Sequence, residues 1–281
     1  MRHAFPTLLA AAALAACSHP AGVAPVAGAG ARAPLQRPAD YRLVWSDEFD
    51  VDGLPDARRW SFDTGRNREG WYNHELQYYA GPRAENALVK NGVLRITARR
   101  ESLSREPDWG GQHYTSARLI TKGKGDWTYG FYDIRARMPC GKGTWPAIWV
   151  VGSGGRWPAD GELDIMEHVG SRPERVSSAV HVTAGSGGYG TVGAVHLPDA
   201  CTAFHDYQMH WTPEYVEFAV DGWPQLRYLN RHTGTDQWPF DKPQFMILNV
   251  AIGGDLGGPV DDAALPVTME VDYVRIWQAP R

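Results

Sequence analysis

Hydrophobic and polar residues alternate with a period of two along several stretches of this chain. Residues 93–99 place Leu94, Ile96 and Ala98 on one face and polar residues on the other, and residues 131–138 alternate in the same way. Because successive side chains of a β-strand point to opposite faces, this pattern predicts strands that are buried on one side. Residues 215–219 lead to an Asp221-Gly222 pair, which is typical of the turn in a β-hairpin.

The C-terminal stretch, residues 267–277, reads as one regular strand. Its alternation groups Met269, Val271, Tyr273 and Arg275 against the residues between them. No stretch after the N-terminal segment keeps an apolar period of 3.6 residues, so helices are not expected. Many short strands separated by turns rich in Gly and Pro predict an all-β sandwich or barrel, and residues 41–281 are expected to form one such domain.

Composition narrows the class of protein. The 281 residues are 43% hydrophobic and 21% charged, which is typical of a globular chain and excludes disorder. The formal net charge of −4 argues against a nucleic-acid partner. Twelve Trp and twelve Tyr in a chain with 31 Gly and 20 Pro favour β-structure built around a ligand that stacks on aromatic rings.

The N-terminus predicts export. Residues 1–16 have a charged start, a short apolar run and small residues at its end, as in a signal peptide. The run closes in Leu14-Ala15-Ala16-Cys17, which resembles the bacterial lipobox, so Cys17 is the expected lipidation site and the alternative is a plain secretory peptide. Residues 17–40 are rich in Ala, Gly and Pro and are expected to be a flexible linker. We therefore expect an exported lipoprotein of the outer membrane or periplasm, in contact with the membrane only through this anchor.

One predicted strand carries three acids. Glu162 and Asp164 are two residues apart and share a face, whereas Glu167 would point into the core if the strand were regular. A buried, unpaired carboxylate is too costly, so we expect a β-bulge at Ile165-Met166 that returns Glu167 to the face of the other two acids.

Three aligned carboxylates suit more than one chemistry. Glycoside hydrolysis needs a nucleophile or base and a proton donor on either side of the bond that breaks. A calcium site also gathers carboxylate oxygens, and a sugar-binding module without catalysis or a solvated acidic strand are further alternatives. Trp145, Trp149 and Trp157 precede the acids closely, and aromatic rings beside paired acids favour a sugar ligand.

Six blocks of the sequence resemble glycoside hydrolase family 16 and, within it, the bacterial laminarinases, which are endo-β-1,3-glucanases. The blocks occur in family order between residues 42 and 278. They are Leu43–Phe49, Asn73–Tyr79, Tyr114–Leu119, Gly143–Trp149, Gly161–His168 and Val271–Arg275.

The resemblance implies a concanavalin-like β-jelly-roll sandwich of two antiparallel sheets, with the polysaccharide in a concave cleft. It assigns Glu162 as the nucleophile, Glu167 as the general acid/base and Asp164 as the residue that orients the nucleophile. It implies retaining hydrolysis of internal β-1,3 or mixed-linkage β-1,3-1,4 bonds in glucans such as laminarin, by double displacement through a covalent glycosyl-enzyme. Related activity on galactans, transglycosylation and a non-catalytic glucan-binding module are its alternatives. It implies no catalytic cofactor, and we expect a monomer.

Further residues follow from the same resemblance. Those expected to bind sugar are Asn73, Arg118, Trp145, Trp149, Trp157 and His181. A structural calcium ion away from the cleft is expected at Glu48, Gly92 and Asp272. Apart from the family, Cys140 and Cys201 are the two thiols that remain when Cys17 is lipidated, and export to an oxidising compartment favours a disulfide over two buried free thiols.

Overall fold

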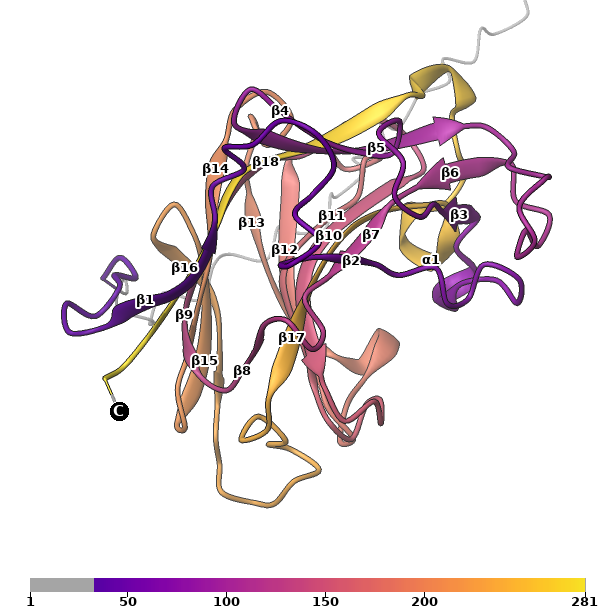
Figure 1. Ribbon diagram of the computed structural model, residues 1–281. Helices are drawn as coiled ribbons and strands as arrows, with labels where there is room; N and C mark the ends of the chain where they lie inside the picture. Colours follow the sequence, from indigo (N-terminus) through magenta and orange to yellow (C-terminus); the bar gives the residue numbers. More distant parts are fainter. Residues whose placement is uncertain (1–32, 281) are drawn as a thin grey trace, which may run out of the picture. The chain divides into compact units, whose positions relative to one another are not determined.

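The structure is a computed structural model that describes residues 33–280, and the predicted signal peptide and Cys17 lie outside this range. Within it the chain forms 18 strands in two sheets, one of ten strands and one of eight (Figure 1). All pairings are antiparallel except that of β3 with β6. The expectation of an all-β sandwich is confirmed.

The ten-stranded sheet has the order β16-β15-β14-β9-β18-β5-β6-β3, and β1 and β4 pair with β18 and β5. Its strands are β1 (Arg42–Asp47), β3 (Gln77–Tyr79), β4 (Ala87–Lys90), β5 (Val93–Arg100), β6 (Tyr114–Ser116), β9 (Gly130–Arg137), β14 (His205–Trp211), β15 (Tyr215–Val220), β16 (Trp223–Leu229) and β18 (Val267–Gln278).

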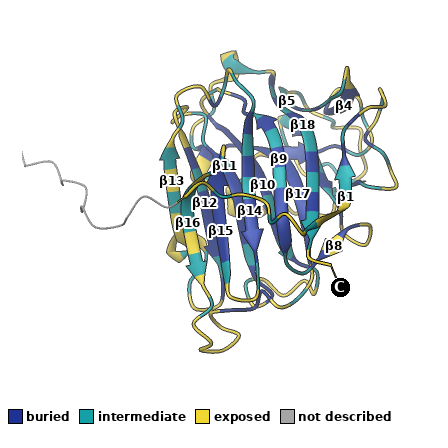
Figure 2. Ribbon diagram, turned by 90° about the vertical axis from the view of Figure 1, so that its left-hand side faces the viewer, coloured by how far each residue is buried: buried dark blue, intermediate teal, exposed yellow. Residues whose placement is uncertain are grey.

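The eight-stranded sheet has the order β13-β12-β11-β10-β17-β7-β2, and β8 pairs with β17. Its strands are β2 (Ser61–Phe62), β7 (Arg118–Ile120), β8 (Asp126–Trp127), β10 (Thr144–Gly152), β11 (Glu162–His168), β12 (Arg175–His181), β13 (Thr191–His196) and β17 (Gln244–Ile252). β13 and β16 each lie at one end of their sheet, and all their residues are exposed or half-buried, as Figure 2 shows.

The hydrophobic core lies between the two sheets. Leu94, Ile134 and Met209 face it from the larger sheet, and Leu163 and Leu248 from the smaller one, all fully buried. Burial of apolar side chains at these alternating positions is what fixes the register of each strand. The other face of the eight-stranded sheet is therefore free to carry polar side chains, and we call it the active-site face.

The C-terminal strand departs from the predicted regular alternation. Met269 and Val271 are buried, but the next buried residues are Val274 and Ile276, on the opposite phase. The ladder between β18 and β9 shifts register between Val271 and Tyr273. The bulge turns both halves of the strand toward the core, which a single alternation could not do.

The segment before the domain also differs from expectation. Residues 33–40, predicted as part of the linker, lie against the sandwich: the Leu35 amide donates to the Gly222 carbonyl at 2.6 Å, and the Arg37 guanidinium lies 5.4 Å from the Trp277 ring centroid. The hairpin turn at Asp221-Gly222 forms as predicted, with positive φ at both residues. Within the described residues, the segment 33–40 therefore packs against the domain.

Helical structure is limited to short pieces. The described residues contain one α-helix, α1 (Gly254–Gly257), and three 3-10 turns, η1 (Tyr72–His74), η2 (Gly187–Tyr189) and η3 (Asp262–Ala264). None of the helices within residues 33–280 has the length and hydropathy to cross a bilayer.

Candidate active site

The three acids share the active-site face because β11 contains the expected bulge. Toward β12, Asp164 pairs with Ala179 and Glu167 with Ser177, so two residues of β11 oppose one of β12. Ile165 and Met166 are both fully buried, while Glu162 and Glu167 are only partly buried. Two consecutive core residues therefore restore the phase, as predicted. Against β10, Met166 pairs with Ile148, so the unpaired residue on that side is Ile165.

Two indole rings hold the outer carboxylates. Trp157 Nε1 donates to Glu162 Oε2 at 2.7 Å, and Trp145 Nε1 donates to Glu167 Oε1 at 3.0 Å. Trp145 comes from β10 and is 9% exposed, whereas Trp157 comes from the β10–β11 loop and is 54% exposed. Two of the three tryptophans predicted from the sequence are thus at the acids, and the side chain of Trp157 is accessible to a ligand.

His181 is also brought to the acids, from the end of β12. Its Nε2 lies 3.1 Å from Asp164 Oδ2 and 4.0 Å from Glu162 Oε1. A Cβ on Gly190 would come within 2.5 Å of His181 Cε1, so this position must be glycine for the ring to keep its place. His181 is therefore fixed beside two of the three carboxylates.

The three carboxyl groups hold their protons more tightly than exposed ones. Burial, and after it the charge of Asp164, raises the pKa of Glu162 to about 8. Burial also raises the pKa of Glu167, against the opposing effect of the Trp145 bond, and it raises the pKa of Asp164 well above its usual range. For Glu167, a raised pKa suits the role of proton donor to a leaving oxygen.

A second polar network runs through β17, and the sequence pattern does not predict it. Trp149 Nε1 donates to Asn249 Oδ1 at 2.8 Å, and Asn249 Nδ2 donates to the Tyr79 hydroxyl at 3.0 Å. Tyr79 in turn donates to Glu75 Oε2 at 3.3 Å. The signal in the sequence was Asn249 itself, a lone amide in an apolar strand, because a buried amide needs partners.

Two further residues predicted to bind sugar are Arg118 in β7 and Asn73 in η1. The Arg118 guanidinium pairs with Asp63 at 2.9 Å and lies 4.7 Å from the centroid of Trp149 and 5.2 Å from that of Trp71. Arg118 therefore fixes the Trp149 ring by a cation–π contact. Asn73 is exposed in η1 with φ +56. Contact of either residue with sugar hydroxyls stays a prediction.

The expected calcium residues converge on one stretch of β18. Asp47 lies opposite Val274, and Leu94 lies opposite Val271, so the chain at Glu48 and at Gly92 approaches Asp272. Both side-chain carboxylates already have cations: Glu48 binds Arg275 at 2.7 Å, and Asp272 binds Arg135 at 3.2 Å. The ion pair with Arg135 uses Oδ2 of Asp272 and leaves Oδ1 as a ligand for an ion, and calcium binding stays a prediction.

Cys140 and Cys201 are joined by a disulfide, with their Cα atoms 5.7 Å apart. Each lies in a connection between the two sheets, Cys140 between β9 and β10 and Cys201 between β13 and β14. The bridge thus links two connections between the sheets, which we call crossings.

A two-sheet sandwich with buried carboxyls held by indole N–H groups on one sheet face has the features of a glycoside hydrolase. The model of the family described as "Glycosyl hydrolases family 16" matches residues 75–275. The β-glucanase of Rhodothermus marinus is 47% identical over 253 residues, which cover 85% of each chain. The chain belongs to glycosyl hydrolase family 16.

Solved structures agree in fold. A variant of SCLam, a non-specific endo-β-1,3(4)-glucanase with 1,3-β-D-cellobiosyl-glucose at its active site, matches with a TM-score of 0.86 and 48% identity, over 89% of this chain and 98% of that one. The laminarinase from Rhodothermus marinus matches with a TM-score of 0.81 and 45% identity, over 86% and 98%. The β-jelly-roll architecture implied by the resemblance is thereby confirmed.

Proposed function

We propose that this chain is an endo-acting, retaining glucanase that cleaves internal β-1,3 bonds, and mixed β-1,3-1,4 bonds, in glucans such as laminarin. The observation that carries the proposal is the arrangement on β11, where Glu162 and Glu167 share a face and each accepts a hydrogen bond from an indole. The likeness to laminarinases and to an endo-β-1,3(4)-glucanase supports the choice of glucan.

The reaction proceeds in two displacement steps. Ionised Glu162 attacks the anomeric carbon while protonated Glu167 gives its proton to the leaving oxygen, so the glycosidic bond breaks as the glycosyl ester forms. Water then attacks the same carbon, Glu167 takes its proton and Glu162 leaves, which regenerates both groups. Asp164 and His181 hold Glu162 in position from one side and Trp157 does so from the other.

Product analysis on laminarin, lichenan and agarose tests the proposal. We expect oligosaccharides of mixed length from laminarin, with the β-anomer formed first in proton NMR, and no products from agarose. Glu162→Gln is the matched control, because the amide keeps the shape of the side chain but cannot form the glycosyl ester. Activity of this variant within tenfold of the parent, or sole cleavage of agarose, would refute the proposal.

We further propose that the enzyme is a monomeric exported lipoprotein anchored through Cys17. The support is the sequence Leu14-Ala15-Ala16-Cys17 after an apolar run, followed by residues 18–32, which are rich in Ala, Gly and Pro. Cys17→Ser should move the protein from the membrane fraction to the soluble periplasmic fraction, whereas equal membrane retention of the variant would argue against the anchor. Light scattering of the released protein tests the monomer.

A further inference from the structure

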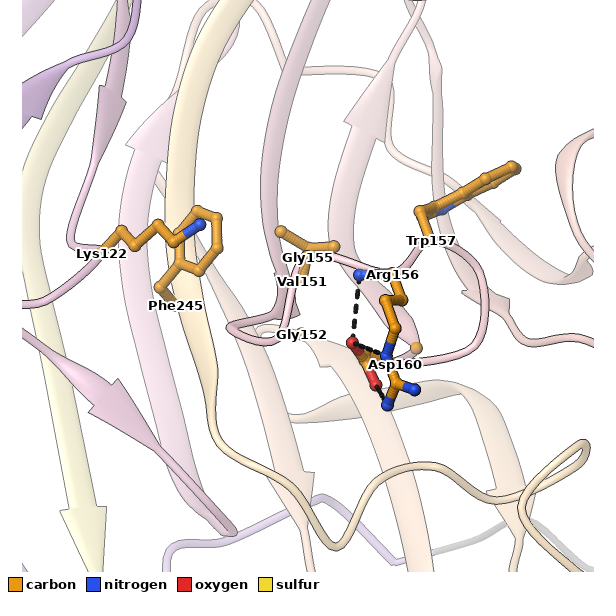
Figure 3. A pocket seen from close by; sticks show the side chains of 9 residues that line it. Lys122, Val151, Gly152, Gly155, Arg156, Trp157, Asp160 and Phe245 are labelled. Atoms are coloured by element: carbon orange, nitrogen blue, oxygen red, sulfur yellow. Dashed lines mark hydrogen bonds and ion pairs between the residues drawn. The ribbon is translucent and has the colours of Figure 1, made fainter.

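A small pocket opens beside the proposed nucleophile. It encloses about 120 Å³. Val151, which lines it, pairs with Glu162 across the β10–β11 ladder, and Trp157, which also lines it, binds the Glu162 carboxylate. In Figure 3, Lys122 and Phe245 stand on one side and Arg156 and Asp160 on the other. The pocket therefore adjoins the place where a ring bound over Glu162 would lie.

The pocket carries more positive than negative charge. Asp160 is 3% exposed and is shared by two cations, Arg156 at 3.0 Å and Lys242 at 3.0 Å. Lys122 is exposed, with its Nζ 5.3 Å from the Phe245 ring centroid, and no carboxylate of residues 33–280 forms an ion pair with it. Asp126, on the same turn as Lys122, accepts bonds from Ser153 and Gly123.

The charged groups in and around the pocket are thus three cations and two carboxylates, namely Arg156, Lys242, Lys122, Asp160 and Asp126. Lys124 is not among them, because it donates to the carbonyls of Ala57 and Trp60. Glu162 adds little negative charge at neutral pH, because burial raises its pKa to about 8. A neutral glucan would gain no charge interaction with the ammonium of Lys122. An anion would accept charge-assisted hydrogen bonds from Lys122 on one side and Arg156 on the other.

We propose that this pocket receives an anionic substituent, a sulfate ester or a carboxylate, carried by the glucosyl unit that binds over Glu162. The β-1,3 linkage leaves the hydroxyls at carbons 2, 4 and 6 free, and the primary hydroxyl at carbon 6 stands on the longest arm. Lys122 and Arg156 bind the anion from opposite sides, and the Trp157 ring forms the wall next to the nucleophile. This inference rests on the proposed glucanase activity and extends its substrates to acidic glucans.

The test compares kcat/KM on laminarin, lightly sulfated laminarin and lightly carboxymethylated laminarin. For Lys122→Gln we expect the ratio of the anionic to the neutral substrate to fall roughly two- to tenfold, through KM more than kcat. The two anionic substrates show whether sulfate or carboxylate is preferred. Lys90→Gln is the matched control, because it removes the same charge from an exposed lysine on β4 that pairs with Asp52.

A charge-reversing variant and added salt test whether the effect of Lys122 is electrostatic. Lys122→Glu should lower the ratio further, and raising the salt to about 0.5 M should reduce the difference between the parent and Lys122→Gln. An unchanged ratio in both Lys122 variants, or an equal loss on neutral laminarin, would overturn the anionic pocket. A parent enzyme that leaves neutral laminarin intact would instead refute the glucanase proposal, so the two failures are distinguishable.

Discussion

Burial of Glu162 beside Asp164 sets the pH at which the nucleophile becomes charged. Because the Asp164 charge is, after burial, the next cause of the raised pKa of Glu162, removing it should lower that pKa. For Asp164→Asn we expect the acidic limb of the kcat/KM profile to move to lower pH, with a reduced kcat because the carboxylate that faces His181 is replaced by a neutral amide. Initial rates on laminarin between about pH 4 and 9 measure both effects.

The control is Asp52→Asn, which removes an exposed carboxylate paired with Lys90 and should leave the limb in place. A limb that stays fixed in Asp164→Asn, or that moves upward, would show that Asp164 does not tune the nucleophile.

The same raised pKa predicts a stability effect. The folded state binds the Glu162 proton more tightly than the unfolded state does, so this group stabilises the fold only at low pH and the benefit is lost as the pH rises from about 4.5 to about 8. Glu162→Gln removes the ionisation. Its free energy of unfolding should exceed that of the parent at pH 8 by up to about 4 kcal/mol and match it near pH 4.5. Thermal unfolding at both pH values checks this, and an equal gain at both would contradict it.

At the scale of single residues, the sequence predicts the three acids but not the side chains that bind them. Glu162, Asp164 and Glu167 are visible because their spacing conflicts with a regular strand. The bonds from Trp145 and Trp157 depend on side-chain directions set by tertiary packing, and the path from Asn249 through Tyr79 joins residues 170 positions apart. No local pattern encodes such a contact.

The bulge in β11 is the element on which the catalytic geometry depends. Deleting Met166 would make the strand regular and turn Glu167 from the active-site face into the core. We expect the deletion variant to lose activity on laminarin as completely as Glu167→Gln does, and to lose stability as well, because a carboxyl group replaces a buried thioether.

Glu167→Gln separates the two effects, because it removes the acid and keeps the strand. Sodium azide, a small external nucleophile, should restore activity to Glu167→Gln on a substrate with an activated leaving group and should not restore it to the deletion variant. A deletion variant that folds and still cleaves glucan would refute the role of the bulge.

The contrast between β11 and β18 shows when strand phase can be predicted. In β11 a carboxyl group cannot point into the apolar core between the sheets, so the phase has one acceptable solution. In β18 Asp272 and Tyr273 tolerate half-buried positions on either face, and both alternations contain apolar residues. The sequence is therefore also compatible with a regular strand there. The bulge forms because Val274 and Ile276 pack into the core.

At the scale of the whole molecule, the sandwich depends on crossings between its sheets. The alternation of short strands predicted the two layers, but not the order of strands within them, because antiparallel neighbours such as β9 and β18 are more than 100 residues apart in the chain. The disulfide lies where two crossings meet. Met138 reinforces this junction, with its amide donating to the Ala200 carbonyl at 3.0 Å.

The bridge closes a loop between residues 61 positions apart, so its loss should enlarge the entropy of the unfolded chain. For the double variant Cys140→Ser, Cys201→Ser we expect the free energy of unfolding to fall by about 2–4 kcal/mol, which for a domain of this size lowers Tm by roughly 5–15 °C. The active-site face should keep its geometry at 25 °C, because Trp145 and Glu167 are held by β10 and β11 themselves. The kcat on laminarin should then change less than about twofold, because the variant is still folded at this temperature.

Parent protein treated with dithiothreitol serves as the control, and its Tm should equal that of the double variant. Two thiols that react with a maleimide in the native parent without reductant, or an unchanged Tm, would show that the crossings are stable without the bridge.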